Sequence, residues 1–505
     1  MELWVICQIM VDSRRLIDLI RLLVRISRKL TEFAHATSVA RLRCGLKLLA
    51  SLMVAIPHSR FRLTRHPKPI KNFMSPRMVM IDDNIRDSSG HYLELAHLLG
   101  SAAKARGFQT ILATHKQFLP DSETEALCKV YPLFDTPSML HWSLGIDGIS
   151  QFARNLKGRI QNRSFGERFL SCWQDVFCKR SRRPSEMIMN WKRAFLKVID
   201  SLDLTEHDHL VLNTANDFVI LATASALQDR QSKKLNIHAI FHFATNHADT
   251  AHGRQRNAKM GQQMNMALGA LGHHQVYIHT TTEELKAEIN SVMDHEIASA
   301  IPYPTRSSEI TIDLEDQPCN AMLAGMPRSE KGKHSIRGFL QALENRNLIG
   351  DTTYRPCLQV PGKHWKSLIP NSLHSSCDTG RVELITKHLS TIEYHQWIGR
   401  AGLGIFLYDP IRYRSRCSGV LLEMLTRGVP VIVPDHCWLA SQFKKACVYG
   451  PVGYVYQQVD EIPDLMCQFL SDREQITGHA KAYAPRLREA HKAENTLLQM
   501  GLQET

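Results

Sequence analysis

The chain has 505 residues, of which 44% are hydrophobic and 22% are charged. This composition is that of a folded globular protein with room for two to four domains, and it excludes disordered and collagen-like classes. Of the formal net charge of +13, most lies in residues 1–76, which contain fourteen Lys and Arg against four Asp and Glu. The rest is nearly balanced and shows no nucleic-acid-binding signature, so we expect no nucleic-acid partner.

The twelve cysteines are scattered and none form a CxxC pair, so the sequence predicts neither a zinc site nor a thioredoxin-like motif. In a chain of this length they suit buried, reduced thiols. Without a signal-peptide pattern, we expect a cytoplasmic protein with no bound metal.

Residues 1–72 are predicted to be a basic helical extension. Within it, residues 11–30 alternate apolar groups with a narrow stripe of mostly basic ones, which is typical of an amphipathic helix. Such a helix could lie on an anionic membrane as a peripheral anchor. The alternatives are a helix packed on the body of the protein, or sequence upstream of the native start. No apolar run is long enough to span a bilayer.

Residues 73–300 are predicted to form a first α/β domain. Strands are expected at 77–82 and 109–114, with a helix between them, which is one unit of a parallel doubly wound sheet. Ligands bind beyond the carboxyl ends of such strands, so the turn at Gly90 and His91 should face a cleft unless it is an ordinary turn.

Within this domain, residues 138–200 mix Trp with Arg and Lys. A helical surface insertion is favoured over contact with an anionic acceptor or a nucleic acid. Strands then follow at 209–213, 237–243 and 275–279, with a helix at 218–227. His242 and His247 sit at or beyond a strand end, where either could act as a base, hold a substrate hydroxyl, or simply be structural.

Residues 301–470 are predicted to form a second α/β domain, followed by C-terminal helices at 471–505. Its strands are expected at 319–324, 355–360, 381–385, 403–408, 429–433 and 453–456, and its helices at 334–344 and 392–400. The predicted fold class is therefore α/β, with two doubly wound Rossmann-like domains facing a cleft and an N-terminal helical extension.

Residues 416–435 read RCSGVLLEMLTRGVPVIVPD. Ser418 can cap a helix, Gly419 permits close approach of a ligand, and Gly428 can end the helix before a short buried strand. A helix N-terminus facing a cleft suits a phosphate or diphosphate, and Glu423, one turn further in, could reach a sugar hydroxyl. The alternative is an ordinary α/β crossover.

The loop after the first strand of the second domain reads GMPRSEKG over residues 325–332. Arg328 and Lys331 should meet the helix at Ser418, and two cations beside a helix N-terminus suit a diphosphate leaving group. The two motifs, roughly ninety residues apart, resemble those of the GT-B glycosyltransferases, particularly the retaining, nucleotide-sugar-dependent glycosyl transferases group 1. The similarity extends from about residue 77 to residue 470.

This resemblance implies transfer of a sugar from a nucleotide diphosphate sugar to an acceptor, with no further cofactor. It implies that Arg328 and Lys331 hold the donor diphosphate, that Glu423 contacts the donor ribose, and that Gly90 and His91 lie near the transferred sugar and the acceptor. His91 and His242 are our candidate catalytic residues.

The chain also departs from the family pattern. Many members carry a second Glu eight residues before the helix Glu, where this chain has Ser415, and an Arg directly after the loop glycine, where it has Met326. Tyr413 and Arg416 are close enough in sequence to supply substitute donor-sugar contacts. Two alternatives to a transferase therefore remain: a non-catalytic binding or scaffold protein at a membrane surface, and a nucleotide-sugar epimerase on the same fold.

Overall fold

The structure is a computed structural model that describes residues 75–87, 91–135, 137–138, 184–228, 230, 233–243, 251–306, 318–360, 362 and 365–503. All of them belong to one compact unit, Pro69–Thr505. The predicted extension at residues 1–72 with its membrane-binding helix, Gly90, His247 and most of the predicted insertion lie outside the described residues.

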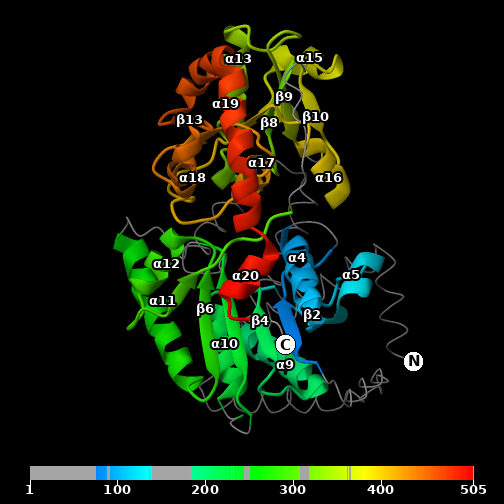
Figure 1. Ribbon diagram of the computed structural model, residues 1–505, viewed down its shortest axis with the longest axis vertical. Helices are drawn as coiled ribbons and strands as arrows, with labels where there is room; N and C mark the ends of the chain where they lie inside the picture. Colours follow the sequence, from blue (N-terminus) through cyan, green and yellow to red (C-terminus); the bar gives the residue numbers. More distant parts are fainter. Residues whose placement is uncertain are drawn as a thin grey trace, which may run out of the picture. The chain divides into compact units, whose positions relative to one another are not determined.

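The first described domain is built on a seven-stranded parallel sheet (Figure 1). In sheet order the strands are β3 (Lys129–Phe134), β2 (Gln109–His115), β1 (Arg77–Asp82), β4 (His209–Leu212), β5 (Asn236–Phe241), β6 (Gln275–Thr280) and β7 (Ala298–Ala300). The helices are α4 (His91–Ala105), α5 (Ser122–Leu127), α9 (Pro184–Leu202), α10 (Asp217–Leu227), α11 (Ala251–Ala270) and α12 (Glu283–Asn290).

Helices cover both faces of this sheet, as β1 shows. Val79 and Ile81 pack in one apolar core with residues of α9, α10 and α11, whereas Met78 and Met80 pack in another with residues of α4. Successive side chains of a strand point to opposite faces, so a strand covered on both faces is apolar throughout. This explains why the sequence RMVMID predicted the position of β1 correctly.

The second domain is built on a six-stranded parallel sheet. In sheet order the strands are β10 (Glu383–Ile385), β9 (Tyr354–Gln359), β8 (Cys319–Leu323), β11 (Leu403–Ile405), β12 (Val431–Pro434) and β13 (Gly453–Tyr456). The α-helices are α13 (Ile336–Asn345), α14 (Trp365–Leu368), α15 (His374–Asp378), α16 (Thr391–Ile398), α17 (Gly419–Leu425), α18 (Trp438–Ala446), α19 (Ile462–Ala490) and α20 (Ala493–Gln499). The predicted fold class, α/β with two doubly wound domains, is confirmed.

In each sheet the strand order reverses direction at one point, between β1 and β4 in the first sheet and between β8 and β11 in the second. Such switch points open crevices at the carboxyl ends of the strands.

Every predicted strand is present, but β3 and β7 were not predicted. β3 carries exposed positions at Lys129 and Pro132, and β7 has only three residues, so neither shows a continuous apolar run.

The predicted surface insertion at residues 138–200 is wrong for its described C-terminal part. From residue 184 the chain forms α9, whose Trp191 and Phe195 are buried and stack at 5.1 Å between ring centroids. The Trp191 indole also donates a 2.9 Å hydrogen bond to Asp83 beyond β1. The basic residues that suggested a surface element lie before residue 184, outside the described residues; within α9 itself, Arg193 and Lys197 are exposed on the outer face of an amphipathic helix.

The predicted boundary at residue 470 is also wrong, because α19 runs without interruption across it. After α19 the chain returns to the first sheet, where α20 packs beside α4 (Figure 1). The hydroxyl of Thr496 donates to the carbonyl of Pro302 at 2.8 Å, and the guanidinium of Arg106 donates to that of Leu502 at 2.7 Å. Helix α19 therefore belongs to the second domain, and α20 completes the first domain instead of forming a separate appendage.

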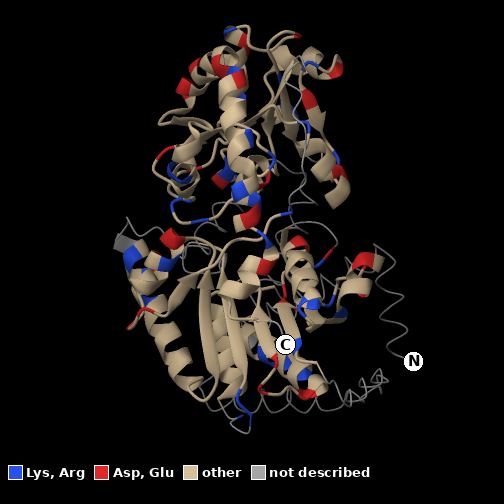
Figure 2. Cartoon of the chain, in the orientation of Figure 1, with Lys and Arg blue, Asp and Glu red and all other residues tan. Residues whose placement is uncertain are grey.

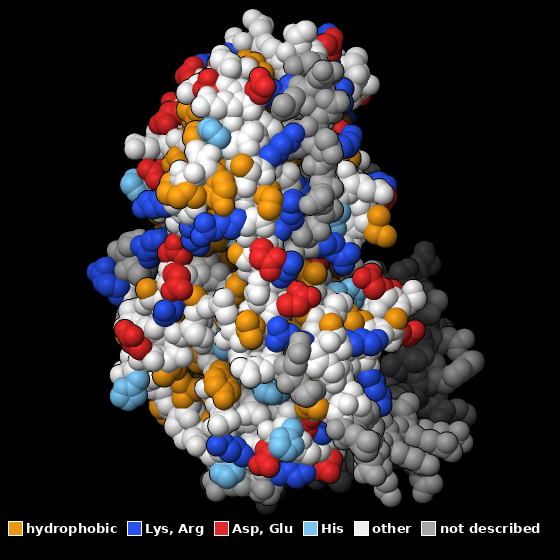
Figure 3. Space-filling view, viewed as in Figure 1, with side chains coloured by type: hydrophobic (Ala, Val, Ile, Leu, Met, Phe, Trp, Pro, Cys, Tyr) orange, Lys and Arg blue, Asp and Glu red, His pale blue; other side chains and the backbone are white. Residues whose placement is uncertain are grey.

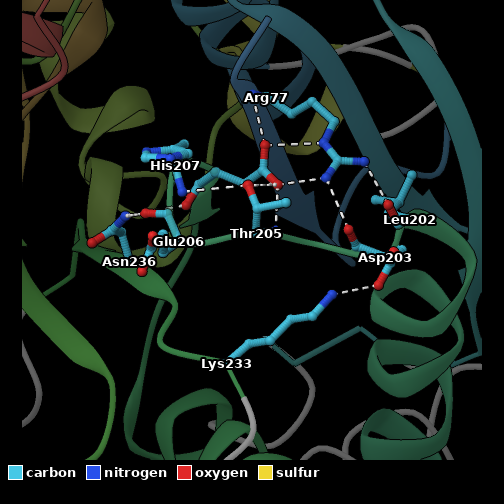
Figure 4. Close-up of polar contacts among 9 residues, drawn as sticks. Arg77, Leu202, Asp203, Thr205, Glu206, His207, Lys233 and Asn236 are labelled. Carbon is cyan, nitrogen blue, oxygen red and sulfur yellow. Dashed lines mark hydrogen bonds and ion pairs between the residues drawn. The ribbon is translucent and has the colours of Figure 1, made fainter. Parts of the chain in front are cut away.

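The amino ends of β1 and β4 are joined by a buried ion pair between Arg77 and Asp208 (Figure 4). Both the backbone N–H and the guanidinium of Arg77 donate to the carboxylate, and Thr205 donates to it through its N–H and its hydroxyl. These bonds hold the pKa of Asp208 below its usual value, although burial alone would raise it. The pair anchors β1 to the loop before β4.

Both signs of charge are interspersed over the described elements (Figure 2) and over the face seen in Figure 3. This agrees with the nearly balanced charge of the sequence after residue 76. None of the helices within the described ranges combines the length and apolar character needed to cross a bilayer.

Candidate functional site

A cavity of about 450 Å³ lies at the carboxyl ends of both sheets and is lined by residues from each domain. Every predicted site residue that the structure describes lines it: His91, His242, Arg328, Lys331, Tyr413, Arg416, Ser418, Gly419 and Glu423. Residues more than three hundred positions apart in sequence thus surround one space. A cavity with convergent polar groups at a topological switch point is where a ligand is expected to bind.

The loop after β8 depends on its two glycines. Gly325 has φ of +88°, and a Cβ there would lie 2.8 Å from Nζ of Lys331. Gly332 has φ of +71°, and a Cβ there would lie 1.8 Å from the carbonyl oxygen of Leu407. Because only glycine fits these positions without strain, the two glycines hold the turn that brings Lys331 to the cavity.

Three of the five cations that line the cavity lie close together: Arg328, Lys331 and Arg416. Nζ of Lys331 lies 5.4 Å from the ring centroid of Tyr408, and the guanidinium of Arg416 lies 4.4 Å from that of Phe243. Burial lowers the pKa of the Lys331 ammonium, with the positive charges of Arg328 and Arg416 as further causes. Within the described part of the chain, the side chains of all three cations have no carboxylate partner.

Helix α17 begins at the cavity, as predicted, but has only seven residues. The Oγ of Ser418 accepts a 3.2 Å hydrogen bond from the N–H of Leu421, and its carbonyl accepts one from Leu422. The N–H groups of Gly419 and Val420 have no partner among the described residues. A helix this short has a small dipole, so these two free donors are its main contribution to the site.

Glu423 is fixed by a residue that sequence reasoning missed. The Tyr394 hydroxyl, on α16, donates a 2.8 Å hydrogen bond to Oε2 of Glu423. Burial and the nearby Glu94 raise the pKa of Glu423, whereas the bond from Tyr394 lowers it. One carboxylate oxygen is therefore held by the protein, and the other is left to accept a ligand hydroxyl.

A hydrogen-bond chain beside Glu423 joins the two domains. Arg427 donates to Nδ1 of His395 at 2.9 Å, so Nε2 of that ring must carry the proton that it donates to Glu94 on α4 at 2.8 Å. Burial alone would raise the pKa of Glu94, but the hydrogen bond from His395 and the positive charges of Arg306 and Arg427 lower it overall. This chain, also missed, fixes α4 relative to α16 at the cavity wall.

The two candidate catalytic histidines are both held neutral. Nε2 of His242 donates to the carbonyl of Asn213 at 2.5 Å, which leaves Nδ1 as an acceptor, and burial lowers its pKa to about 4. Desolvation by the surrounding protein is the largest cause that lowers the pKa of His91 to about 3, although its side chain is accessible to solvent. The nearby His242 and the cations of the cavity are the further causes. A ring with so low a pKa is a weak base but a good hydrogen-bond acceptor.

Two buried carboxylates stand behind the cavity at the end of β1. Burial raises the pKa of Asp82 to about 6, and burial together with the charge of Asp82 raises that of Asp83 to about 7. Asp82 accepts from Thr214 at 2.9 Å, and Asp83 accepts from the hydroxyl of Ser138 at 2.8 Å. The N–H of Asn84 donates to Asp82 at 3.0 Å, so the carboxylates position the turn that begins at Asn84. Asn84 itself lines the cavity.

A second cavity, of about 540 Å³, lies at the amino ends of the first sheet around Arg77 and Asp208. These two charges bind each other and adjacent loop groups (Figure 4). We therefore place the candidate site in the first cavity, where Arg328, Lys331 and Arg416 have no carboxylate partner among the described residues.

The residues that were missed share one position in the fold. Glu94 lies in the first turn of α4, and Tyr394 and His395 lie in the middle of the short helix α16. Both helices begin at the same edge of their sheets as the cavity. The rule that parallel strands present their carboxyl ends to ligands could have indicated these helix starts, but no local motif marks them.

No family model matches the chain, and no curated protein matches it. Solved structures do: sucrose-phosphate synthase from Thermosynechococcus elongatus aligns with a TM-score of 0.54 and 13% identity over 84% of this chain and 97% of that chain. A trehalose-6-phosphate synthase aligns with a TM-score of 0.54 and 10% identity over 84% and 98%. A glycosyltransferase from Rickettsia africae aligns with a TM-score of 0.53 and 10% identity over 85% and 97%. At these identities the likeness shows the fold, which is the GT-B fold of glycosyltransferases.

Proposed function

We propose that this chain is a glycosyltransferase that moves a sugar from a nucleotide diphosphate sugar to an acceptor. The observation that carries the proposal is the convergence of Arg328, Lys331 and the free N–H groups of Gly419 and Val420 on one cavity of the GT-B fold. Cations and backbone donors in fixed positions suit a diphosphate.

In the proposed reaction the bond between the anomeric carbon and the diphosphate oxygen breaks, and an acceptor hydroxyl oxygen bonds to that carbon. Negative charge then grows on the leaving diphosphate. Arg328 and Lys331 stabilise this charge, which lowers the barrier because the attraction is stronger in the transition state than in the ground state. The family resemblance extends the proposal to retention of the anomeric configuration.

The remaining residues orient the two substrates. Glu423 accepts hydrogen bonds from the donor ribose, and its geometry is supported by Tyr394. Nδ1 of His242 accepts a hydrogen bond from a substrate hydroxyl, since its other nitrogen is committed to Asn213. With a pKa of about 4, His242 serves better in orientation than as a general base at neutral pH.

The test is calorimetric titration with UDP, GDP and ADP. At least one should bind the wild-type protein, and Arg328→Ala and Lys331→Ala should each weaken it about tenfold or more, as expected for lost charge-assisted hydrogen bonds. Lys366→Ala is a matched control, because Lys366 also lies over an aromatic ring, 5.7 Å from the centroid of Trp365, but does not line the cavity. Failure of all three nucleotides to bind would refute the proposal.

A further inference from the structure

Arg416 is one of the five cations that line the cavity, and the diphosphate does not account for it. A diphosphate diester carries two negative charges at neutral pH. Arg328 and Lys331, on the loop after β8, already supply two positive charges. Arg416 comes from a different segment, directly before α17, and adds a third.

Arg416 is held in place from both domains. Its neighbour Ser415 accepts a 2.6 Å hydrogen bond at the backbone carbonyl from the hydroxyl of Thr282, the N-cap residue of α12. The guanidinium lies 4.4 Å from the ring centroid of Phe243, just beyond β5, and 5.1 Å from that of Tyr413. Aromatic faces orient a guanidinium but leave its in-plane N–H donors free.

Two carboxylates that line the same cavity, those of Glu94 and Glu423, are engaged elsewhere. Among the described residues Arg416 makes ring contacts and no ion pair. Glu94 binds His395, and Glu423 binds Tyr394. A partly buried cation without a counter-ion is costly, and five donors in a planar fork match a phosphate or a carboxylate.

The charge of Arg416 also acts on two histidines of the first domain. It acts on His242, and together with Arg328 and Lys331 it acts on His91. These two histidines are the groups proposed to face the acceptor and the transferred sugar. Both rings are neutral, and Arg416 is a permanent positive charge that acts on both of them.

We propose that Arg416 binds a second anionic group, a phosphate or a carboxylate carried by the acceptor or by the transferred sugar. The proposal rests on the proposed function, since it requires the diphosphate to occupy Arg328 and Lys331. It specifies the substrate class: the acceptor or the transferred sugar carries an anionic group in addition to the diphosphate of the donor.

The experiment compares wild type, Arg416→Gln and Arg328→Gln, with Arg412→Gln as a control at an exposed arginine outside the cavity. The first measurement is affinity for the nucleoside diphosphate that wild type binds best. The second, at saturating nucleoside diphosphate, is affinity for inorganic phosphate, glucose 6-phosphate and glucose, which tests the acceptor. The third compares UDP-glucuronate with UDP-glucose, or the corresponding pair on the preferred base, which tests the transferred sugar.

Arg416→Gln should keep its nucleoside diphosphate affinity to about twofold, whereas Arg328→Gln loses about tenfold or more. Wild type should prefer the anionic probe in at least one of the two substrate comparisons, and Arg416→Gln should lose that preference by about tenfold. If Arg416→Gln loses nucleoside diphosphate affinity as strongly as Arg328→Gln, Arg416 belongs to the diphosphate clamp and the inference is overturned. Equal affinity for anionic and neutral probes in wild type overturns it too, while leaving the proposed function intact. If wild type binds no nucleoside diphosphate, both this inference and the proposed function are refuted.

Discussion

The Oγ of Ser415, on the second domain, donates a 2.6 Å hydrogen bond to Oε2 of Glu288, on α12 of the first domain. Ser415 is 3% exposed and does not line the cavity. The position at which many group 1 enzymes carry a Glu near the donor sugar is therefore used here for contact between the domains. A carboxylate at this position would face another carboxylate.

Restoring that Glu should damage the protein. We expect Ser415→Glu to lower the free energy of unfolding by about 2 kcal/mol or more, because it sets a second negative charge against Glu288 in a buried place. Ser415→Ala should cost only about 1 kcal/mol, the net worth of one hydrogen bond. Chemical denaturation measures both, and equal stability of the Glu and Ala variants would contradict the contact.

Gly332 should be intolerant of any side chain. Gly332→Ala adds a Cβ 1.8 Å from the carbonyl oxygen of Leu407 at φ of +71°, so the loop must move and carry Lys331 with it. We expect a loss of about 2–4 kcal/mol in stability and, by displacement of Lys331, weaker nucleotide binding. The matched control is Gly338→Ala within α13, where a Cβ meets no atom within 4 Å. That change should stabilise the protein by about 0.5–1 kcal/mol, and a loss comparable with Gly332→Ala would refute the argument.

Tyr394→Phe tests whether Glu423 binds the ribose. The hydrogen bond from Tyr394 lowers the pKa of Glu423, so its loss raises that pKa further. Ribose binding needs the ionised carboxylate, and the acid limb of nucleotide binding should therefore move to higher pH in the variant. Pyrophosphate, which has no ribose, serves as the control ligand. A shift of the same size for pyrophosphate would assign Glu423 another role.

A row of histidines crosses the first sheet and should make its stability sensitive to acid. His209, His238 and His279 are linked by ring nitrogens at 3.0 Å and 3.1 Å, and the row ends on the hydroxyl of Ser299. Burial lowers the pKa of His279 from 6.5 to about 4. The native state thus favours the neutral ring. The contribution of His279 to the free energy of unfolding is therefore complete above pH 6.5 and is lost as the pH falls from 6.5 to 4.

The variant for this prediction is His279→Gln, which keeps hydrogen-bonding groups but does not titrate. The difference in unfolding free energy between wild type and variant should shift in favour of the variant as the pH falls from 6.5 to 4. Using this difference cancels the opposite contribution of Asp82 and Asp83, whose raised pKa values cost stability as the pH rises. A difference that does not vary with pH would show that His279 does not titrate in this window.

Much of the fold could be predicted from local pattern. The strands β1 and β13 were predicted residue for residue. β1 is covered on both faces and is therefore mostly apolar, whereas β13 is an edge strand rich in Tyr and Val, which favour strands. The glycine loop at 325–332 and the capped helix start at Ser418 were recognised for a similar reason: backbone conformation and capping impose residue types at short spacing. The helix α9 was misjudged, since the basic residues upstream of it say nothing about what its own apolar face covers.

By itself, the sequence determined the alternation of strands and helices, the two motifs that we propose bind phosphate, and the candidate residues Arg328, Lys331 and Glu423. These depend on neighbours within a few positions along the chain. Only the tertiary structure decided that Tyr394 holds Glu423, that His395 bridges to Glu94, that Ser415 faces Glu288, and that Arg416 has no carboxylate partner among the described residues. Each of those relationships joins segments that are distant in sequence, and the packing of two domains around one cavity is what brings them together.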